Sequence, residues 1–166
     1  VPRASSFVTA LFLLSPTAAL AGPADWPNVD AHIAARVLGV LEEAADRLSR
    51  PACSAVLFDF DDGRTGRPLA ETLSRTGLRP EEWLRSIYFL DGAGHRGCAD
   101  RRTVAYTPNG APVVFVCPVA LSRHRMQDPS FAATVLIHEA LHSLGLGENP
   151  PSSWAITMKV QERCGR

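Results

Sequence analysis

The sequence lacks several features that would place it directly in a class. Its four cysteines, Cys53, Cys98, Cys117 and Cys164, include no C-x-x-C pair, which argues against a zinc site held by cysteines. Neither charge is in excess, with 17 basic and 17 acidic residues, so we expect no nucleic acid or acidic membrane as partner. No internal repeat or low-complexity linker divides the 166 residues, which fit a single domain.

A membrane-spanning run is also missing at the start of the chain. The apolar residues 7–14 fall short of the roughly 20 that a spanning helix needs, and Pro16 interrupts the stretch. A positive residue precedes this run and the small-x-small sequence Ala19-Leu20-Ala21 follows it, which predicts an export signal over residues 1–21. We therefore expect residues 22–166 to form one secreted or periplasmic domain, monomeric and without stable insertion in a membrane.

Helical and strand-like patterns alternate along the rest of the chain. This alternation predicts an α+β fold with a short mixed sheet or hairpin packed on a buried helix that carries the site. The hairpin turn is expected at Pro108-Asn109-Gly110, and the best-marked helix begins after the capping residue Asp128 and ends before Gly145. Helices are expected over residues 29–48, 69–78, 129–144 and 152–164 and from residue 80, and strands over residues 55–60, 87–90, 103–106 and 113–116.

The four cysteines follow the expected export signal, so they would enter an oxidising compartment. An even number of cysteines there predicts two disulfides, and three pairings are possible. Cys98 lies near the start of the predicted hairpin and Cys117 at its end, which favours their pairing. By elimination, Cys53 would pair with Cys164 and tie the chain terminus to the end of the first helix.

One motif carries recognisable chemistry. The sequence His138-Glu139-Ala140-Leu141-His142 has the form H-E-x-x-H and lies within the best-marked helix. A spacing of four residues places the imidazoles of His138 and His142 on one helix face, one turn apart, so that both can bind one Zn²⁺. Glu139 projects to the adjacent side, where it can act as general base toward a zinc-bound water. The motif therefore predicts a zinc cofactor and a hydrolytic reaction.

The same residues could instead be ordinary helix side chains without a metal. The apolar residues around them argue against this interpretation, because they make the helix hydrophobic on nearly all sides. These neighbours are Val135, Leu136, Ile137, Leu141 and Leu144. Three ionisable groups in one turn of a buried helix are destabilising unless they are paired or bind a metal. The sequence therefore favours a metal site.

The longer pattern His138-Glu139-x-x-His142-x-x-Gly145-x-x-Glu148 resembles the metzincin signature H-E-x-x-H-x-x-G-x-x-H/D. In size and in its acidic third position, the chain is similar to the snapalysin type of small secreted bacterial protease. This resemblance implies a small zincin-like domain and a metallopeptidase that cleaves protein or peptide substrates. It also implies that Glu148 is the third metal ligand, brought back to the metal by a sharp turn at Gly145.

Other residues could complete the zinc site. Glu162 is the alternative third ligand, because it stands at the separation from His138 that thermolysin-like gluzincins have, although their N-E-x-x-x-D pattern is missing. His95 and His124 are weaker candidates, since each lies in a predicted loop. We favour Glu148 because a tight glycine turn fixes its position more directly.

The resemblance also indicates where a substrate would bind. In a zincin-like fold an edge strand ahead of the active helix binds an extended peptide, and Val113–Cys117 is the segment we expect to do so. Tyr106 and Arg123 are candidates to stabilise the oxyanion. The alternative function is a non-catalytic secreted zinc-containing binding protein. Glu139 argues against it, because structural zinc is normally closed by four protein ligands and needs no base beside the histidines.

A second motif suggests a different enzyme class. The segment Val56–Asp61 resembles the opening motif of haloacid-dehalogenase-type phosphatases, in which an apolar strand ends in D-x-D. The remaining parts of that family do not follow, since the only lysine is Lys159 and no paired acidic motif lies downstream. We therefore interpret the acidic residues as part of a turn.

Overall fold

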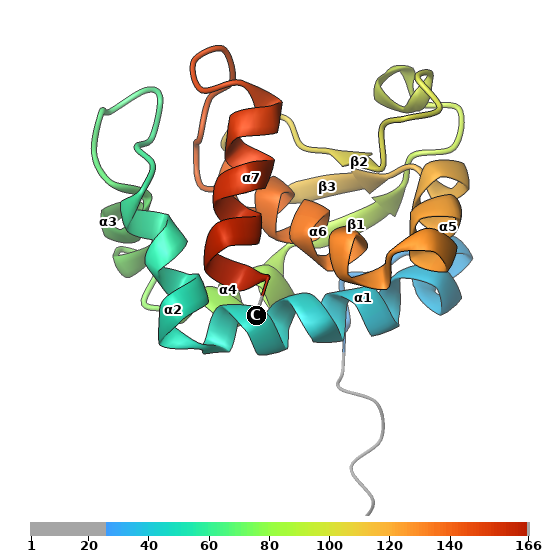
Figure 1. The fold of residues 1–166 in the computed structure, drawn as a ribbon, viewed down its shortest axis with the longest axis horizontal. Coiled ribbons are helices and arrows are strands. Elements are labelled where there is room, and N and C mark those ends of the chain that lie inside the picture. The colour runs from blue at the N-terminus through green and yellow to red at the C-terminus, as the bar shows by residue number, and fades with distance from the viewer. Residues whose placement is uncertain (1–25, 166) are drawn as a thin grey trace, which may run out of the picture.

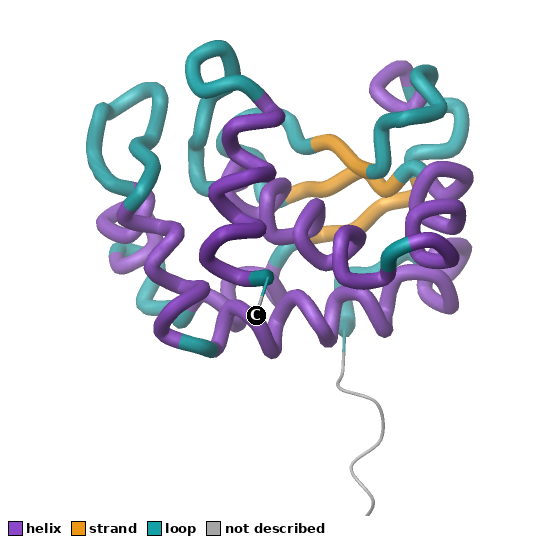
Figure 2. The backbone as a smooth tube through the Cα atoms, viewed as in Figure 1, coloured by secondary structure: helices purple, strands orange, loops and turns teal. Residues whose placement is uncertain are grey.

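The described residues, 26–165 of a computed structural model, form seven α-helices, two short 3₁₀ helices and a three-stranded sheet (Figure 1 and Figure 2). The predicted α+β class is confirmed, and the expected export signal lies outside the described residues. In chain order the elements are α1 (Ala31–Ser49), α2 (Pro51–Ser54), the 3₁₀ helix η1 (Ala55–Phe58), α3 (Leu69–Ser74), α4 (Pro80–Ser86), β1 (Tyr88–Asp91), the 3₁₀ helix η2 (Arg96–Cys98), β2 (Ala105–Tyr106), β3 (Val113–Val116), α5 (Pro118–Gln127), α6 (Pro129–Ser143) and α7 (Ser153–Cys164).

The sheet has the strand order β1-β3-β2, so β3 is its central strand. β2 runs antiparallel to β3, with Ala105 opposite Val116, which confirms the predicted hairpin. β1 runs parallel to β3, with Tyr88 opposite Val113. The prediction that Val113–Cys117 is an edge strand is therefore wrong, because β1 pairs with it on one side and β2 on the other. The edge on the hairpin side belongs to β2.

Helix α1 packs its apolar face against α4 and α6. Its start is capped by Asp30, whose carboxylate accepts a hydrogen bond from the His32 N–H at 2.9 Å. The buried side chains recur at helical spacing, which confirms the helix predicted there. They include Ile33, Val37, Leu41, Ala44 and Leu48. Burial of this apolar stripe anchors the long helix to the rest of the domain.

Helix α6 lies at the centre of the molecule, with the strands on one side and α7 on the other (Figure 1). Asp128 caps its start by accepting a hydrogen bond from the Phe131 N–H at 3.1 Å. Gly145, with a φ of 109°, follows its end as predicted. Because neighbours cover α6 on nearly all sides, several of its polar residues are buried with it: Thr134, His138, Glu139, His142 and Ser143.

Two parts of the chain differ from the sequence-based expectation. The strand expected over residues 55–60 is instead η1, which continues directly from α2. Val56 and Leu57 are buried while Phe58 is 74 % exposed, as continued helical winding requires. A short apolar run alone cannot separate these two outcomes. Helix α5 was not expected, although Pro118 at its first position is a typical helix-start signal.

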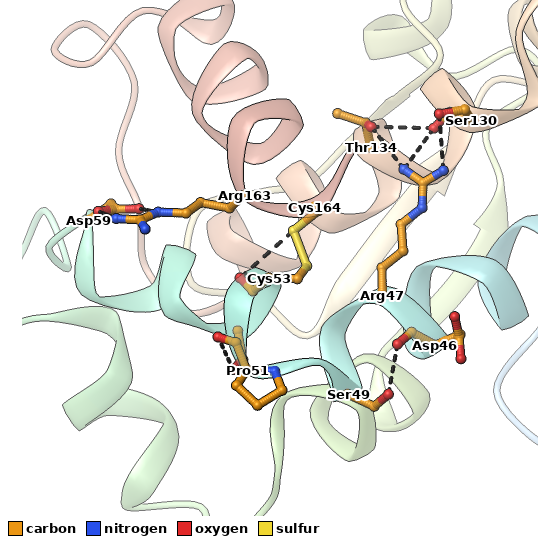
Figure 3. Close-up of a disulfide and its surroundings, with 11 residues drawn as sticks. Asp46, Arg47, Ser49, Pro51, Cys53, Asp59, Ser130, Thr134, Arg163 and Cys164 are labelled. Atoms are coloured by element: carbon orange, nitrogen blue, oxygen red, sulfur yellow. Dashed lines mark hydrogen bonds and ion pairs between the residues drawn. A yellow bond between two sulfur atoms is a disulfide. The ribbon is translucent and has the colours of Figure 1, made fainter. Parts of the chain in front are cut away.

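Both predicted disulfides are present. Cys98 and Cys117 join η2 to the residue that follows β3. Cys53 and Cys164 join α2 to the last residue of α7 (Figure 3). The second bond spans 111 positions of the sequence and ties the C-terminal helix to the segment that follows α1.

Two arginines reinforce the same region (Figure 3). Arg163 donates two hydrogen bonds to the Asp59 carboxylate, at 2.7 and 2.8 Å. Arg47 of α1 is buried and donates to the Ser130 carbonyl oxygen at 3.1 Å, and to the hydroxyls of Ser130 and Thr134 at 3.0 and 3.3 Å. Polar contacts thus join α1 to α6 and join the end of α7 to the residue that follows η1.

Candidate metal centre

Two imidazoles face each other on the buried side of α6. His138 and His142 lie one helical turn apart, and their Nε2 atoms are 2.9 Å apart. Both side chains are almost completely buried. Helical spacing alone brings these two nitrogens together, as the sequence predicts.

The second nitrogen of each ring has its own partner. His142 Nδ1 lies 2.6 Å from the carbonyl oxygen of Leu146, which can only accept, so the ring proton is on Nδ1 and the lone pair is on Nε2. His138 Nδ1 lies 2.9 Å from the Thr157 hydroxyl of α7. Such outer partners orient the rings and leave Nε2 available as a ligand atom.

The electrostatic surroundings keep the His138 ring neutral. Burial, together with a smaller contribution from the neighbouring His142, lowers the pKa of His138 to about 3. Without a metal, the neutral His138 ring can donate its Nε2 proton to His142 Nε2, and a bound cation would take the place of that proton. Neutral imidazole is the form that binds metals, so the two converging Nε2 atoms suit a cation.

Glu148 adds a carboxylate to this pair. After α6 the chain turns at Gly145, and the Glu148 side chain returns so that its Oε1 lies 3.8 Å from His138 Nε2 and 3.6 Å from His142 Nε2. The three ligand atoms lie within 4.8 Å of one another, and the Glu148 side chain is 41 % exposed. The described residues thus bring together two nitrogens and one oxygen, donors that suit a divalent transition metal with one side left open.

Glu162, the alternative third ligand, lies elsewhere. It is on the C-terminal part of α7, and its carboxylate accepts a hydrogen bond from Lys159 Nζ at 2.6 Å. The side chain is exposed and does not belong to the group formed by the two histidines and Glu148. Between the two candidates, only Glu148 stands where a shared metal would be.

Glu139 lies beside the histidines on α6 and is 6 % exposed. Burial raises the pKa of its carboxyl to about 7; the Thr107 hydroxyl acts in the lowering direction, and the Glu148 charge in the raising direction. Its Oε2 has no hydrogen-bond partner among the described residues. A carboxyl with a pKa near neutrality and an unpaired oxygen is suited to take up and release a proton.

A cavity of about 350 Å³ opens next to these groups. We call it the inner cavity; it lies between the hairpin and the end of α6. Both Glu139 and Glu148 reach it, so a molecule bound there would meet the carboxylates and the ligand atoms together. Its lining residues are Thr103, Ala105, Tyr106, Thr107, Asn109, Glu139, His142, Leu146, Glu148 and Ser153.

A larger hollow of about 880 Å³ adjoins the inner cavity. We call this larger hollow the apolar groove. It shares four lining residues with the inner cavity: Thr103, Ala105, Glu139 and Ser153. Phe131 and Val135 of α6 and Trp154 and Met158 of α7 contribute its apolar surface. Trp154 is 72 % exposed, which is unusual for so large an apolar side chain.

Comparison with protein-family models, curated proteins and solved structures gives no match. The interpretation of the site therefore depends on its own geometry. Within residues 26–165, none of the helices combines the length and the apolar character that crossing a membrane requires.

The remaining candidate residues lie outside the metal centre. His95 stacks on Phe115, with ring centroids 4.5 Å apart, and contacts the Tyr106 hydroxyl. Tyr106 lines the inner cavity, but its hydroxyl is bound to His95. His124 lines the apolar groove. Arg123 is exposed on α5 and lines neither hollow, so its proposed contact with an oxyanion is not supported.

Asp59 of the phosphatase-like motif and Asp62, which follows the motif, both have structural partners. The segment ahead of them is the 3₁₀ helix η1, so the strand that this motif requires is absent from the described residues. Asp59 is paired with Arg163. The Asp62 carboxylate is buried and accepts the Arg64 N–H at 2.8 Å, and this contact contributes most to lowering its pKa. The motif thus serves local structure.

Proposed function

We propose that the protein is a secreted zinc-dependent metallopeptidase with His138, His142 and Glu148 as metal ligands and Glu139 as general base. The observation that carries this proposal is the convergence of two buried imidazoles and a carboxylate beside a buried Glu139 oxygen that has no hydrogen-bond partner among the described residues. Three protein ligands with an open side are typical of catalytic zinc, whereas structural zinc is closed by four.

The chain's own groups support a proton-transfer role for Glu139. A bound Zn²⁺ would supply a Lewis acid that polarises a carbonyl and makes water more acidic. Glu139 faces the inner cavity, where its carboxylate can take a proton from the attacking water and deliver it to the leaving amine. Because burial raises the pKa of Glu139 to about 7, both transfers are accessible near neutral pH.

The cavities support an extended peptide as substrate. The strand at the edge of the sheet on this side is β2, Ala105–Tyr106, so β2 and not Val113–Cys117 is the strand that a peptide could pair with. Residues 103–107 line the inner cavity, the apolar groove or both. A peptide lying along β2 could pair with its main chain, as extended ligands do at sheet edges. The apolar groove beside Glu139 would then accept an apolar side chain of the substrate at Trp154.

The two disulfides support secretion. Structural disulfides persist in oxidising compartments such as the periplasm or the extracellular space. All four cysteines are used in these bonds. The export signal expected at residues 1–21 would deliver the chain to such a compartment.

Substitution of Glu139 by Gln tests the proposal. Glutamine keeps the size of the side chain but cannot act as a base, so we expect Glu139→Gln to bind one zinc per chain and to cleave a peptide library about 10²- to 10⁴-fold more slowly than wild type. Zinc content by mass spectrometry and cleavage by chromatography measure the two effects separately. If wild type binds zinc, cleaves nothing and behaves like Glu139→Gln, the alternative of a zinc-containing binding protein replaces this proposal.

A further inference from the structure

Residues 61–68 form a tight turn whose two ends pair in antiparallel fashion. The Asp62 N–H donates to the Arg67 carbonyl oxygen at 2.8 Å across the turn. Inside the turn, the Asp62 carboxylate accepts the Arg64 N–H at 2.8 Å and the residue is only 2 % exposed. A buried carboxylate that is satisfied within its own turn makes that turn rigid.

This turn contacts the segment that follows α6. The Gly63 N–H donates to the Gly145 carbonyl oxygen at 2.9 Å, and Asp62 forms an antiparallel bridge with Leu146. A Cβ atom at position 145 would lie 2.9 Å from Cγ of Asp62. The φ of 109° and this close approach together leave room only for glycine at position 145.

The contacted segment carries two parts of the metal centre. Leu146, the bridge partner of Asp62, supplies the carbonyl oxygen that orients His142 through its Nδ1. Glu148 follows two residues later and places its Oε1 near both imidazoles. A shift of residues 145–147 would therefore disturb the orientation of one ligand and the position of another.

We propose that Asp62 is a positioning residue of the metal centre. Its carboxylate shapes the turn at residues 61–68, which holds residues 145–147 so that the Leu146 carbonyl and Glu148 meet the histidines. The proposal rests on the proposed function only in that the centre binds a divalent metal. The proposal gives Asp62, which directly follows the phosphatase-like motif, a role in placing metal ligands.

Variants at position 62 and their controls test this role through zinc affinity, measured by competition with a chromophoric chelator. Asp62→Ala removes the carboxylate, and we expect zinc affinity to fall about tenfold to hundredfold, the range for loss of groups that orient metal ligands. Asp62→Asn keeps an oxygen for the Arg64 N–H and should retain most of the affinity. Asp61→Ala removes the same charge from an exposed neighbour and should leave affinity unchanged. An equal loss in Asp61→Ala would overturn the proposal.

A second measurement, made on the metal-free protein, reports on the orientation of His142. The His142 Nδ1–H bonded to Leu146 gives a proton resonance whose exchange with solvent can be followed by NMR in the metal-free protein. We expect faster exchange in Asp62→Ala than in wild type or Asp61→Ala, while thermal unfolding stays cooperative. Should Asp62→Ala not fold, Asp62→Ser is measured by the same two signals, because its shorter hydroxyl is a weaker acceptor for the Arg64 N–H. We expect a smaller loss of zinc affinity and a smaller rise in exchange, and no change in either signal would overturn the proposal.

The outcomes separate the two proposals. If wild type binds no zinc, the metallopeptidase proposal fails, and the exchange of the His142 proton alone decides the role of Asp62. If wild type binds zinc, either an unchanged affinity or an unchanged exchange rate in Asp62→Ala overturns the positioning role.

Discussion

At the scale of single residues, Glu148 is the side chain that favours a metal site over a plain pair of buried histidines. Its Oε1 lies within 4 Å of both Nε2 atoms, whereas Glu162 is bound to Lys159 on the outside of α7. We expect Glu148→Ala to lose more zinc affinity than the roughly tenfold to hundredfold lost with an outer partner, because a ligand itself is removed. Glu162→Ala removes the same charge and serves as the control. Loss of zinc in Glu162→Ala alone would identify the other ligand.

The sequence could predict the site residues that lie on one helix or only a few positions beyond it. His138, Glu139 and His142 share one helix, so their spacing fixes their faces, and Glu148 follows a glycine turn only a few residues later. Thr157 and the Leu146 carbonyl could not be predicted as partners of the rings. Thr157 belongs to a separate helix, and its approach to His138 depends on how α7 packs against α6.

At the scale of elements, α7 connects the metal centre to the region around α2. Thr157 near its middle contacts His138, a proposed metal ligand, and Arg163 near its end pairs with Asp59. The Arg163 hydrogen bonds lower the pKa of the Asp59 carboxyl below its ordinary value of 3.8. The ion pair therefore stabilises the folded state fully at neutral pH, and the contribution is lost as the pH falls through the lowered pKa.

The Asp59→Asn variant tests this attachment. We expect it to lower the free energy of unfolding by about 0.5 to 1 kcal/mol at pH 7, since Arg163 is partly exposed and the pair is screened. At a pH below the lowered pKa of Asp59, wild type and variant should be equally stable. Urea unfolding at a series of pH values measures the difference, with Asp61→Asn as control. A difference that grows toward acid pH contradicts this role of the pair.

Several elements with clear local signals were predicted correctly, whereas the place of a strand in the sheet depends on distant pairing and was not. The apolar periodicity of α1, the cap of α6 at Asp128 and the turn of the hairpin are all local features of the sequence, so these elements could be predicted. The central position of β3 depends on parallel pairing with β1, a strand from a different part of the chain. Local patterns contain no information on that pairing, which is why Val113–Cys117 was wrongly expected at the edge.

At the scale of the whole molecule, the two disulfides differ in the length of chain that they close. Cys53–Cys164 spans 111 positions and Cys98–Cys117 spans 19. A cross-link restricts the unfolded chain more when its loop is longer, with about 4.7 kcal/mol for a loop of about 100 residues and about 3 kcal/mol for about 15. The larger loop contains every helix and strand that follows α2.

We therefore expect the double variant Cys53→Ala with Cys164→Ala to lose more stability than Cys98→Ala with Cys117→Ala. Denaturant unfolding of both double variants and wild type gives the comparison. The first variant should also release the end of α7, so we expect it to bind zinc more weakly as well. Equal or reversed losses in stability would contradict the effect of loop length.

X-ray absorption of the zinc-loaded wild-type protein tests the proposed metal centre most directly. We expect one zinc per chain, with imidazole nitrogens at about 2.0 to 2.1 Å, oxygen ligands at about 2.0 to 2.2 Å and no sulfur at about 2.3 Å. The imidazole contribution should fit two rings, as His138 and His142 predict. A protein that takes up no zinc, or a zinc shell with fewer than two imidazoles, would contradict the proposed centre.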